Sequence, residues 1–426
     1  MSVARSRALI YEVVMSSSPV TALPSADSCD FLEARHLDPH QASLHEEFEG
    51  LRRAQRERAT NGASIYDLSM VNPDMAPPRA LLDRLLESVT KTANHRYAVS
   101  RGVRRLRDGF SAKYRDKFGH ALDPETDICV CLGSKDATFH ALRVLIEAGD
   151  GVIVPAPYYP AHPSAVALTG GRCVPWSASR DPLEAARTLE GLIVQSRARV
   201  LLLNFPSNPT GMTVSRQWWS EIGKVCAAAN VTILNDFVYG EMCFSGESAH
   251  SALCAAEVGA TAIEVYSLSK AYNVPGWRVG ALVGDTERVS AVSRLKSQAD
   301  YGLFLPLQYA AAQALISGDD LVSATVQTYH RRLKVLGSGL AELGWGVTIP
   351  EAGASIWTKY PERLVASERL SRFNSVNVAR HLLDLSGVVV TPGILFGPQF
   401  DGYVRLAAVT NEERLRDVLG ALRKVA

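Results

Sequence analysis

One lysine in this chain is framed by hydroxyl groups, in the segment SLSKAYNVPGWR. Lys270 follows Ser267 and Ser269, and Arg278 comes a short way after it. Serine and arginine side chains bind anions such as phosphate. A lysine whose pKa is lowered by burial or nearby charge forms Schiff bases with carbonyl compounds. An isolated S-x-S-K is more often a solvated loop, but apolar runs on both sides of this turn favour an amine held beside a bound anion.

Other chemically distinctive residues also follow apolar runs. Ser134 and Lys135 open a helical segment after Gly133, and the free N–H groups of a helix start bind phosphate. Asp236 ends the run VTILN, where a carboxylate is costly without a cationic partner. An anion seat, an amine and a carboxylate are what pyridoxal phosphate requires. The further candidates are an aromatic ring for stacking, Tyr158 or Tyr159, and the donors Asn208 and Tyr239 for the ring oxygen.

These residues need elements that bring them together. Short apolar strands alternate with helical patterns from about residue 127 to 284, which predicts a mostly parallel sheet between helices. Ligands of such sheets bind at the carboxyl ends of the strands, where the candidates fall. We therefore predict an α/β fold with a seven-stranded sheet and a smaller α+β domain. The expected strands lie near 127–132, 151–155, 172–176, 199–204, 231–235, 262–266 and 279–283.

Length and composition indicate an ordinary globular protein of two domains. The chain has 426 residues, and its 45 basic residues nearly balance 44 acidic ones, so we expect no nucleic-acid partner. No apolar run is long enough to span a bilayer, and we expect no membrane partner. An odd number of cysteines, seven, favours reduced thiols and a cytoplasmic location. The expected parts are a flexible arm at 1–40, a segment at 41–90 that contributes to the small domain, a large cofactor-binding domain at 91–320 and a C-terminal small domain at 321–426.

Two cysteine-containing segments contain residue types that can bind a metal. Cys129 and Cys131 alternate within an expected strand, without a second ligand pair at finger-like spacing. His250 and Cys254 in SAHSALC are interpreted in the same way, as core residues. The sequence therefore predicts no metal site.

Eight segments, taken in order and spacing, resemble class I/II aminotransferases of fold type I, which use pyridoxal phosphate. Within that family they are similar to the branch of bacterial alanine, methionine and LL-diaminopimelate aminotransferases. The resemblance covers about residue 65 to the C-terminus. The segments are YAVSRGVRRLR, GSKDATFHAL, PAPYYPAH, NFPSNPTG, NDFVYGEM, SLSKAYNVPGWRVG, PGILFG and YVRLAAVTNEERL.

The resemblance assigns a role to each candidate. It makes Lys270 the Schiff-base lysine and proton shuttle, and Asp236 the partner of the pyridine nitrogen. Arg405 would bind the substrate α-carboxylate, and Tyr97 would reach the phosphate of a neighbouring subunit in a homodimer with shared active sites. The remaining implied contacts are Asn208 and Tyr239 on the ring oxygen, Tyr159 on the ring face, and Ser134, Lys135, Ser267 and Arg278 on the phosphate.

The expected reaction moves an amino group between an L-amino acid and a 2-oxo acid. Met75 and Ala76 replace a glycine-containing turn of relatives, and Leu303 and Leu305 are bulky for their positions. These departures suggest a specialised, non-proteinogenic amino acid as donor. The alternative is a pyridoxal-phosphate enzyme on the same scaffold that performs elimination, cyclisation or oxidation on an amino acid such as an arginine derivative.

Overall fold

The computed structural model describes residues 39–317, 319–361 and 374–425. The expected arm at 1–40 therefore lies almost wholly outside the described residues. None of the helices in these ranges combines the length and the hydropathy that a membrane crossing needs.

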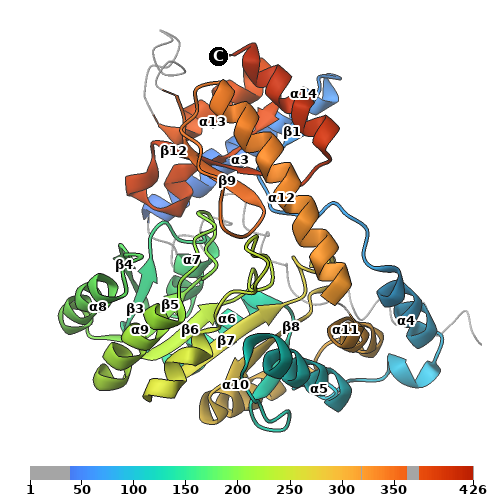
Figure 1. The fold of residues 1–426 in the computed structure, drawn as a ribbon, viewed down its shortest axis with the longest axis vertical. Coiled ribbons are helices and arrows are strands. Elements are labelled where there is room, and N and C mark those ends of the chain that lie inside the picture. The colour runs from blue at the N-terminus through green and yellow to red at the C-terminus, as the bar shows by residue number, and fades with distance from the viewer. Residues whose placement is uncertain (1–38, 318, 362–373, 426) are drawn as a thin grey trace, which may run out of the picture. The chain divides into compact units, whose positions relative to one another are not determined.

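A seven-stranded sheet carries the larger core (Figure 1). Its order is β2-β8-β7-β6-β5-β3-β4, and all neighbours are parallel except β8, which runs antiparallel to β2 and β7. The mostly parallel sheet predicted from the sequence is confirmed, with every strand end within one residue of its expected position. The strands are β2 (Ile128–Cys131), β3 (Gly151–Pro155), β4 (Arg172–Trp176), β5 (Ala198–Leu203), β6 (Thr232–Asp236), β7 (Ala262–Ser267) and β8 (Gly280–Gly284).

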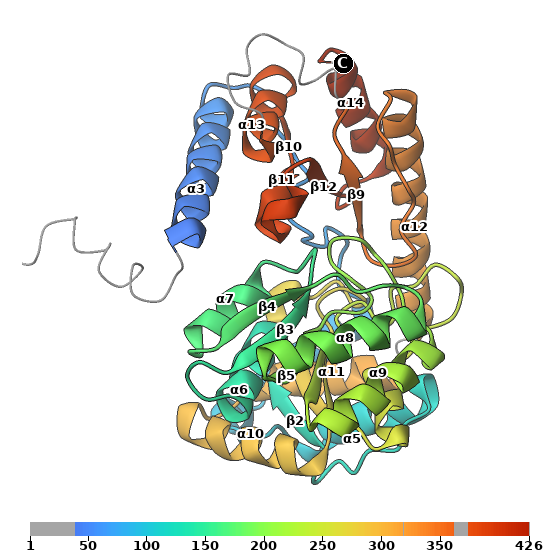
Figure 2. The same cartoon turned by 90° about the vertical axis from the view of Figure 1, so that its left-hand side faces the viewer.

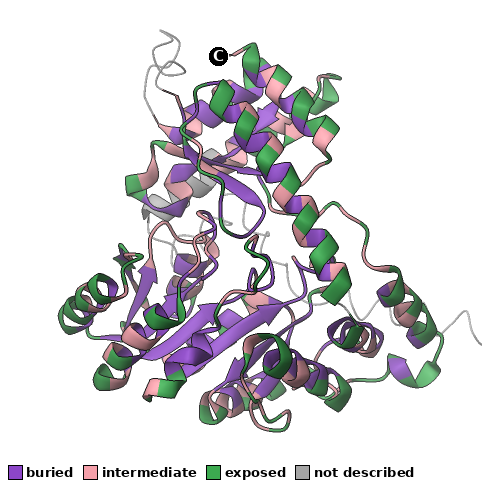
Figure 3. Cartoon of the chain, in the orientation of Figure 1, coloured by how far each residue is buried: buried purple, intermediate pink, exposed green. Residues whose placement is uncertain are grey.

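Helices cover both faces of this sheet because successive strand residues point to opposite sides. In β3, Ile153 joins one hydrophobic cluster while Val152 and Val154 join another. The strands β2, β6, β7 and β8 are buried along their whole length, whereas β4 at the edge of the sheet has exposed residues (Figure 3). The helices α8 and α9 pack side by side on the first cluster (Figure 2). The first cluster includes α4 (Arg79–Val89), α5 (Arg104–Lys113), α8 (Pro182–Ser196), α9 (Arg216–Ala229) and α11 (Leu305–Ser317); the second includes α6 (Ser134–Leu145), α7 (Ala161–Leu168) and α10 (Thr286–Ala299).

A separate hydrophobic cluster belongs to the C-terminal part of the chain, and Leu51 and Ala54 of the N-terminal helix α3 join it. A three-stranded antiparallel sheet, in the order β11-β12-β9, lies here, and β1 pairs with β10 in parallel. These elements form a smaller α+β part, to which α3 contributes Leu51 and Ala54. Its elements are α3 (Pro39–Thr60), β1 (Tyr66–Asp67), α12 (Asp319–Glu342), β9 (Ser355–Lys359), α13 (Ser375–Ser386), β10 (Val388–Val389), β11 (Thr391–Pro392), β12 (Tyr403–Ala407) and α14 (Glu412–Arg423).

The direction of the strands decides where chemistry can occur. The strands β5, β6 and β7 are parallel, so Asn204, Asp236 and Ser267 come at the same edge of the sheet. The antiparallel strand β8 starts at that edge, since its Gly280 pairs with Ser267. Arg278, which lies just before β8, is therefore at the same end of the sheet as Ser267.

Candidate active site

Lys270 lies in the turn after β7 and is half-buried. Its Nζ donates a very short hydrogen bond to the backbone oxygen of Val71. Burial, together with the positive charges of Arg405 and Arg278, lowers the pKa of Lys270 to about 8. A substantial fraction of this amine is therefore neutral, and so nucleophilic, near physiological pH.

Asp236 ends β6 with its carboxylate buried. One carboxylate oxygen, Oδ2, lies 3.1 Å from Nε2 of His162 in α7, whereas Oδ1 is buried and has no hydrogen-bond partner among the described residues. The backbone oxygen of Asp236 accepts a hydrogen bond of 2.6 Å from Asn204 Nδ2. The carboxylate is thus held from one side and offers its other oxygen to a donor, which is what a protonated pyridine nitrogen requires.

Arg405, on β12, is a buried guanidinium fixed by several neighbours. It donates to Asn208 Oδ1 at 2.9 Å and to the backbone oxygen of Ser69 at 2.5 Å, and its Cζ lies 5.1 Å from the centre of the Phe396 ring. Burial lowers the pKa of Arg405 from its usual range. A fixed, buried guanidinium without a protein carboxylate among these contacts is suited to a carboxylate brought in by a ligand.

A cradle for an anion lies at the start of α6. Gly133 precedes that helix at φ +83°, and a Cβ added there would come within 2.3 Å of Nη2 of Arg278. The helix has no side-chain cap, so its first N–H groups, at Ser134 and Lys135, have no carbonyl within the helix to bond. Ser267 adds a hydroxyl that donates to Ser269 Oγ at 2.9 Å. A phosphate-binding site is thus formed by a glycine, free N–H groups, a hydroxyl and a guanidinium.

Two tyrosines lie close to this constellation and a third lies apart. Tyr159 is half-buried, with its ring 5.3 Å from and perpendicular to that of His162. Burial raises the pKa of Tyr159 and, more strongly, of Tyr239, so both stay protonated donors at neutral pH. Tyr97 is instead 83% exposed and packs against the ring of Tyr301, with the ring centres 4.5 Å apart.

Sequence reasoning missed several residues of the site. His162 lies inside the segment PAPYYPAH but was given no role, and Asn204 is the first asparagine of NFPSN. The Val71 and Ser69 contacts are made by backbone oxygens, which leave no mark in a sequence. The His162 side chain gave no usable signal either, because its partner Asp236 is 74 positions away and only the fold brings the two together.

The residues present fit pyridoxal phosphate on three independent structural points. These are the unpaired Oδ1 of Asp236, the Cβ-free space at Gly133 beside the Arg278 guanidinium, and the lowered pKa of Lys270. Fold and site together define a fold-type I pyridoxal-phosphate enzyme.

The chain belongs to the class I and II aminotransferase family, whose sequence model matches residues 63–422. It is 34% identical over 397 residues to the glutamate-pyruvate aminotransferase AlaC of Escherichia coli, covering 92% of this chain and 93% of that protein. It is 32% identical over 368 residues to an LL-diaminopimelate aminotransferase of Dehalococcoides mccartyi, covering 86% and 92%. Substrate-bound BacF from Bacillus subtilis superposes with a TM-score of 0.79 at 26% identity, covering 89% of this chain and 94% of BacF. This chain is therefore a pyridoxal-phosphate-dependent aminotransferase, as its sequence segments indicated.

Proposed function

We propose that this aminotransferase works with Lys270 as its Schiff-base amine and proton carrier, Asp236 as the partner of the pyridine nitrogen, and Arg405 as the receptor of the substrate α-carboxylate. The single observation that carries the assignment is the convergence of these three side chains. The charges of Asp236 and Arg405 both act on the pKa of Lys270, although the three residues come from separate parts of the chain.

Bound pyridoxal phosphate supplies an aldehyde that condenses with amines and a ring that accepts the electron pair left at the substrate Cα. The protein does the rest. Arg405 would hold the α-carboxylate by a bidentate fork, and Lys270 Nζ would take the proton from Cα and deliver it to the cofactor carbon that carries the amino group. Asp236, oriented by His162, keeps the ring nitrogen protonated, which maintains the electron-accepting form.

The remaining contacts are proposed from the resemblance to the family. Asn208 and Tyr239 are assigned to the ring oxygen, and Tyr159 to the ring face. Ser134 and Lys135 bind phosphate through the start of α6, with Ser267 and Arg278 on its other side. The substrates are an L-amino acid and a 2-oxo acid.

We assign the enzyme to a homodimer with shared active sites. The ring of Tyr97 is largely uncovered by its own subunit. This exposure supports a role for Tyr97 at the phosphate of a neighbouring subunit. The six cysteines among the described residues are all free thiols, which supports a cytoplasmic location.

The donor is proposed to be a specialised amino acid rather than alanine or diaminopimelate. The loop that carries Val71 reaches Lys270, and Asp74 of the same loop is pinned by Arg332 at 2.6 and 3.0 Å. Met75 follows Asp74 on this fixed loop and packs, partly buried, against the large core cluster. Leu303 supports the idea less, because its side chain is 6% exposed and lies within the large core cluster.

A panel of amino donors tests both the transamination reaction and the preference for a specialised donor. Each amino acid is added without acceptor while the visible absorption of the bound cofactor is followed, and a 2-oxo acid is then added to restore it. A reversible change with a large donor supports the proposal, whereas best turnover with alanine contradicts the specialised donor. Release of ammonia or consumption of O₂ in place of restoration would support elimination or oxidation. The Met75→Gly variant is expected to shift preference toward smaller donors.

A further inference from the structure

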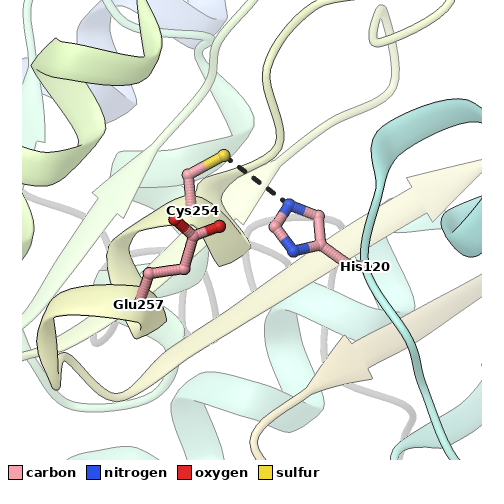
Figure 4. A group of neighbouring side chains, drawn as sticks. All are labelled: His120, Cys254 and Glu257. Atoms are coloured by element: carbon pink, nitrogen blue, oxygen red, sulfur yellow. Dashed lines mark hydrogen bonds between the residues drawn. The ribbon is translucent and has the colours of Figure 1, made fainter.

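A histidine, a cysteine and a glutamate meet away from the residues assigned to catalysis. Cys254 and Glu257 lie on the 3₁₀ helix η4 (Ala252–Val258), and His120 lies on the loop after the π-helical turn η3 (Tyr114–Phe118). One ligand atom from each lies within 4.8 Å of those from the other two. Figure 4 shows the Cys254 and Glu257 side chains projecting from neighbouring turns toward the His120 ring.

The spacing of the two soft ligand atoms is that of a metal site. His120 Nε2 lies 3.6 Å from Cys254 Sγ. Zinc binds thiolate sulfur at about 2.3 Å and imidazole nitrogen at about 2.0 Å, and a tetrahedral angle between these bonds separates the two atoms by about 3.5 Å. The ion therefore fits between these side chains without a change in their separation.

The burial of the three groups also suits zinc. Cys254 is buried, His120 is half-buried and Glu257 is exposed, so a sulfur and a nitrogen point outward from the core to a carboxylate at the surface. Thiolate, imidazole and carboxylate together favour Zn²⁺ over Mg²⁺ or Ca²⁺, which prefer oxygen ligands. A water molecule from the solvent side would complete four ligands.

One positive charge opposes such an ion. Arg216, at the start of α9, donates to the Glu257 carboxylate at 2.5 and 2.6 Å and to Cys254 Sγ at 3.8 Å. Its side chain is 58% exposed, so the guanidinium is free to rotate into solvent when Glu257 turns to a metal. The arginine sets the affinity of the site by competing for the same carboxylate.

We propose that His120, Cys254 and Glu257 form a zinc-binding site that ties the loop after η3 to η4. The start of η4 is already anchored to the sheet, because Ala252 N donates to Glu264 of β7 at 2.8 Å. Zinc would add a cross-link near the amino end of β7, whereas Lys270 follows its carboxyl end. It stabilises this part of the protein and leaves the catalytic residues untouched.

The test uses the pyridoxal-phosphate-loaded protein, stripped of metal by a chelator and titrated with ZnCl₂ against a chromophoric competitor. We expect one zinc per subunit, with one proton released to the buffer from the Cys254 thiol. Cys254→Ser and His120→Ala should each weaken binding at least about 100-fold. Cys173→Ser and His330→Ala, which alter a thiol and an imidazole elsewhere, should bind zinc as the parent does.

The Arg216→Gln variant is expected to change zinc affinity in the opposite direction. Removal of the competing guanidinium should tighten zinc binding, and zinc should raise the midpoint temperature of the parent but not of Cys254→Ser. Transaminase kcat should not respond to zinc in either protein. Absence of a zinc site, or zinc binding that persists in both Cys254→Ser and His120→Ala, would overturn the proposal and leave a neutral thiol hydrogen-bonded to an imidazole.

Discussion

His162 Nε2 lies 3.1 Å from Oδ2 of Asp236, and the other oxygen of that carboxylate is buried without a partner among the described residues. The histidine therefore fixes the direction in which the free oxygen points. In the proposed site Asp236 contacts the cofactor, and His162 acts only through Asp236.

The first prediction concerns that pair. Asp236→Asn should lower kcat about 1,000-fold, because a neutral amide no longer keeps the ring nitrogen protonated. His162→Asn should lower kcat only about tenfold, since the carboxylate stays but is less well oriented. Steady-state kinetics with saturating cofactor measure both. Equal losses in the two variants would show that His162 does more than orient Asp236.

Arg405→Lys should raise the KM for the amino acid about 10- to 100-fold with a smaller effect on kcat, because an ammonium replaces a bidentate fork. The matched control is Arg380→Lys, whose exposed guanidinium pairs with Asp384. Its KM should equal that of the parent. An unchanged KM in Arg405→Lys would remove Arg405 from carboxylate binding.

The pH dependence of cofactor attachment follows from the pKa of Lys270. This pKa is lowered to about 8, so the neutral amine that attacks the aldehyde is the minor form below pH 8 and the major form above it. The rate of covalent attachment to the cofactor-free protein should rise with pH, with its midpoint at about 8. Arg405→Met should move the midpoint upward, because a positive charge is lost. A midpoint near the ordinary lysine value of 10.5 in the parent would contradict the structure.

Gly133→Ala should weaken retention of pyridoxal phosphate. The new Cβ would lie 2.3 Å from Arg278 Nη2, at a φ of +83° that disfavours alanine. Gly119→Ala is the control, since Gly119 also has positive φ, +76°, but nothing within 4 Å of the added atom. Both variants should lose stability, yet only Gly133→Ala should lose cofactor on dialysis. Equal retention would place the phosphate elsewhere.

Lys113→Met should lower the free energy of unfolding by about 3 kcal/mol, because it leaves Glu241 charged and buried. Lys113 Nζ lies 3.1 Å from Glu241 and 2.7 Å from Asp319. A second change, Glu241→Gln, should restore part of the loss by removing the orphaned charge. Thermal unfolding measures the loss of stability, and Arg79→Met is the control. That variant breaks the exposed ion pair with Asp83 and should change stability little.

The sequence predicted the sheet better than it predicted the contacts. Apolar runs such as VTILN are long and bounded by polar residues, so strand positions followed from local pattern. Strand order did not, because pairing depends on packing between distant segments. The same reason explains His162, whose partner Asp236 is 74 positions away.

Cys254 shows the limit most clearly. The sequence places it beside His250 in SAHSALC and predicts a core residue. The structure confirms its burial, yet its sulfur faces His120, which is 134 positions away. A pairing between a loop and a distant 3₁₀ helix has no spacing rule by which to find it.

The antiparallel course of β8 has a consequence for redesign of this enzyme. Because Gly280 pairs with Ser267, the connection from Lys270 to Arg278 is closed at both ends, so its length is part of the catalytic geometry. An inserted or deleted residue there would displace Lys270 and Arg278, the proposed covalent anchor and phosphate ligand, together. The loop at Val71 to Met75 is held by the contact of Val71 with Lys270 and by the pairing of Asp74 with Arg332, so its other side chains can be exchanged for a new donor while these two contacts are kept.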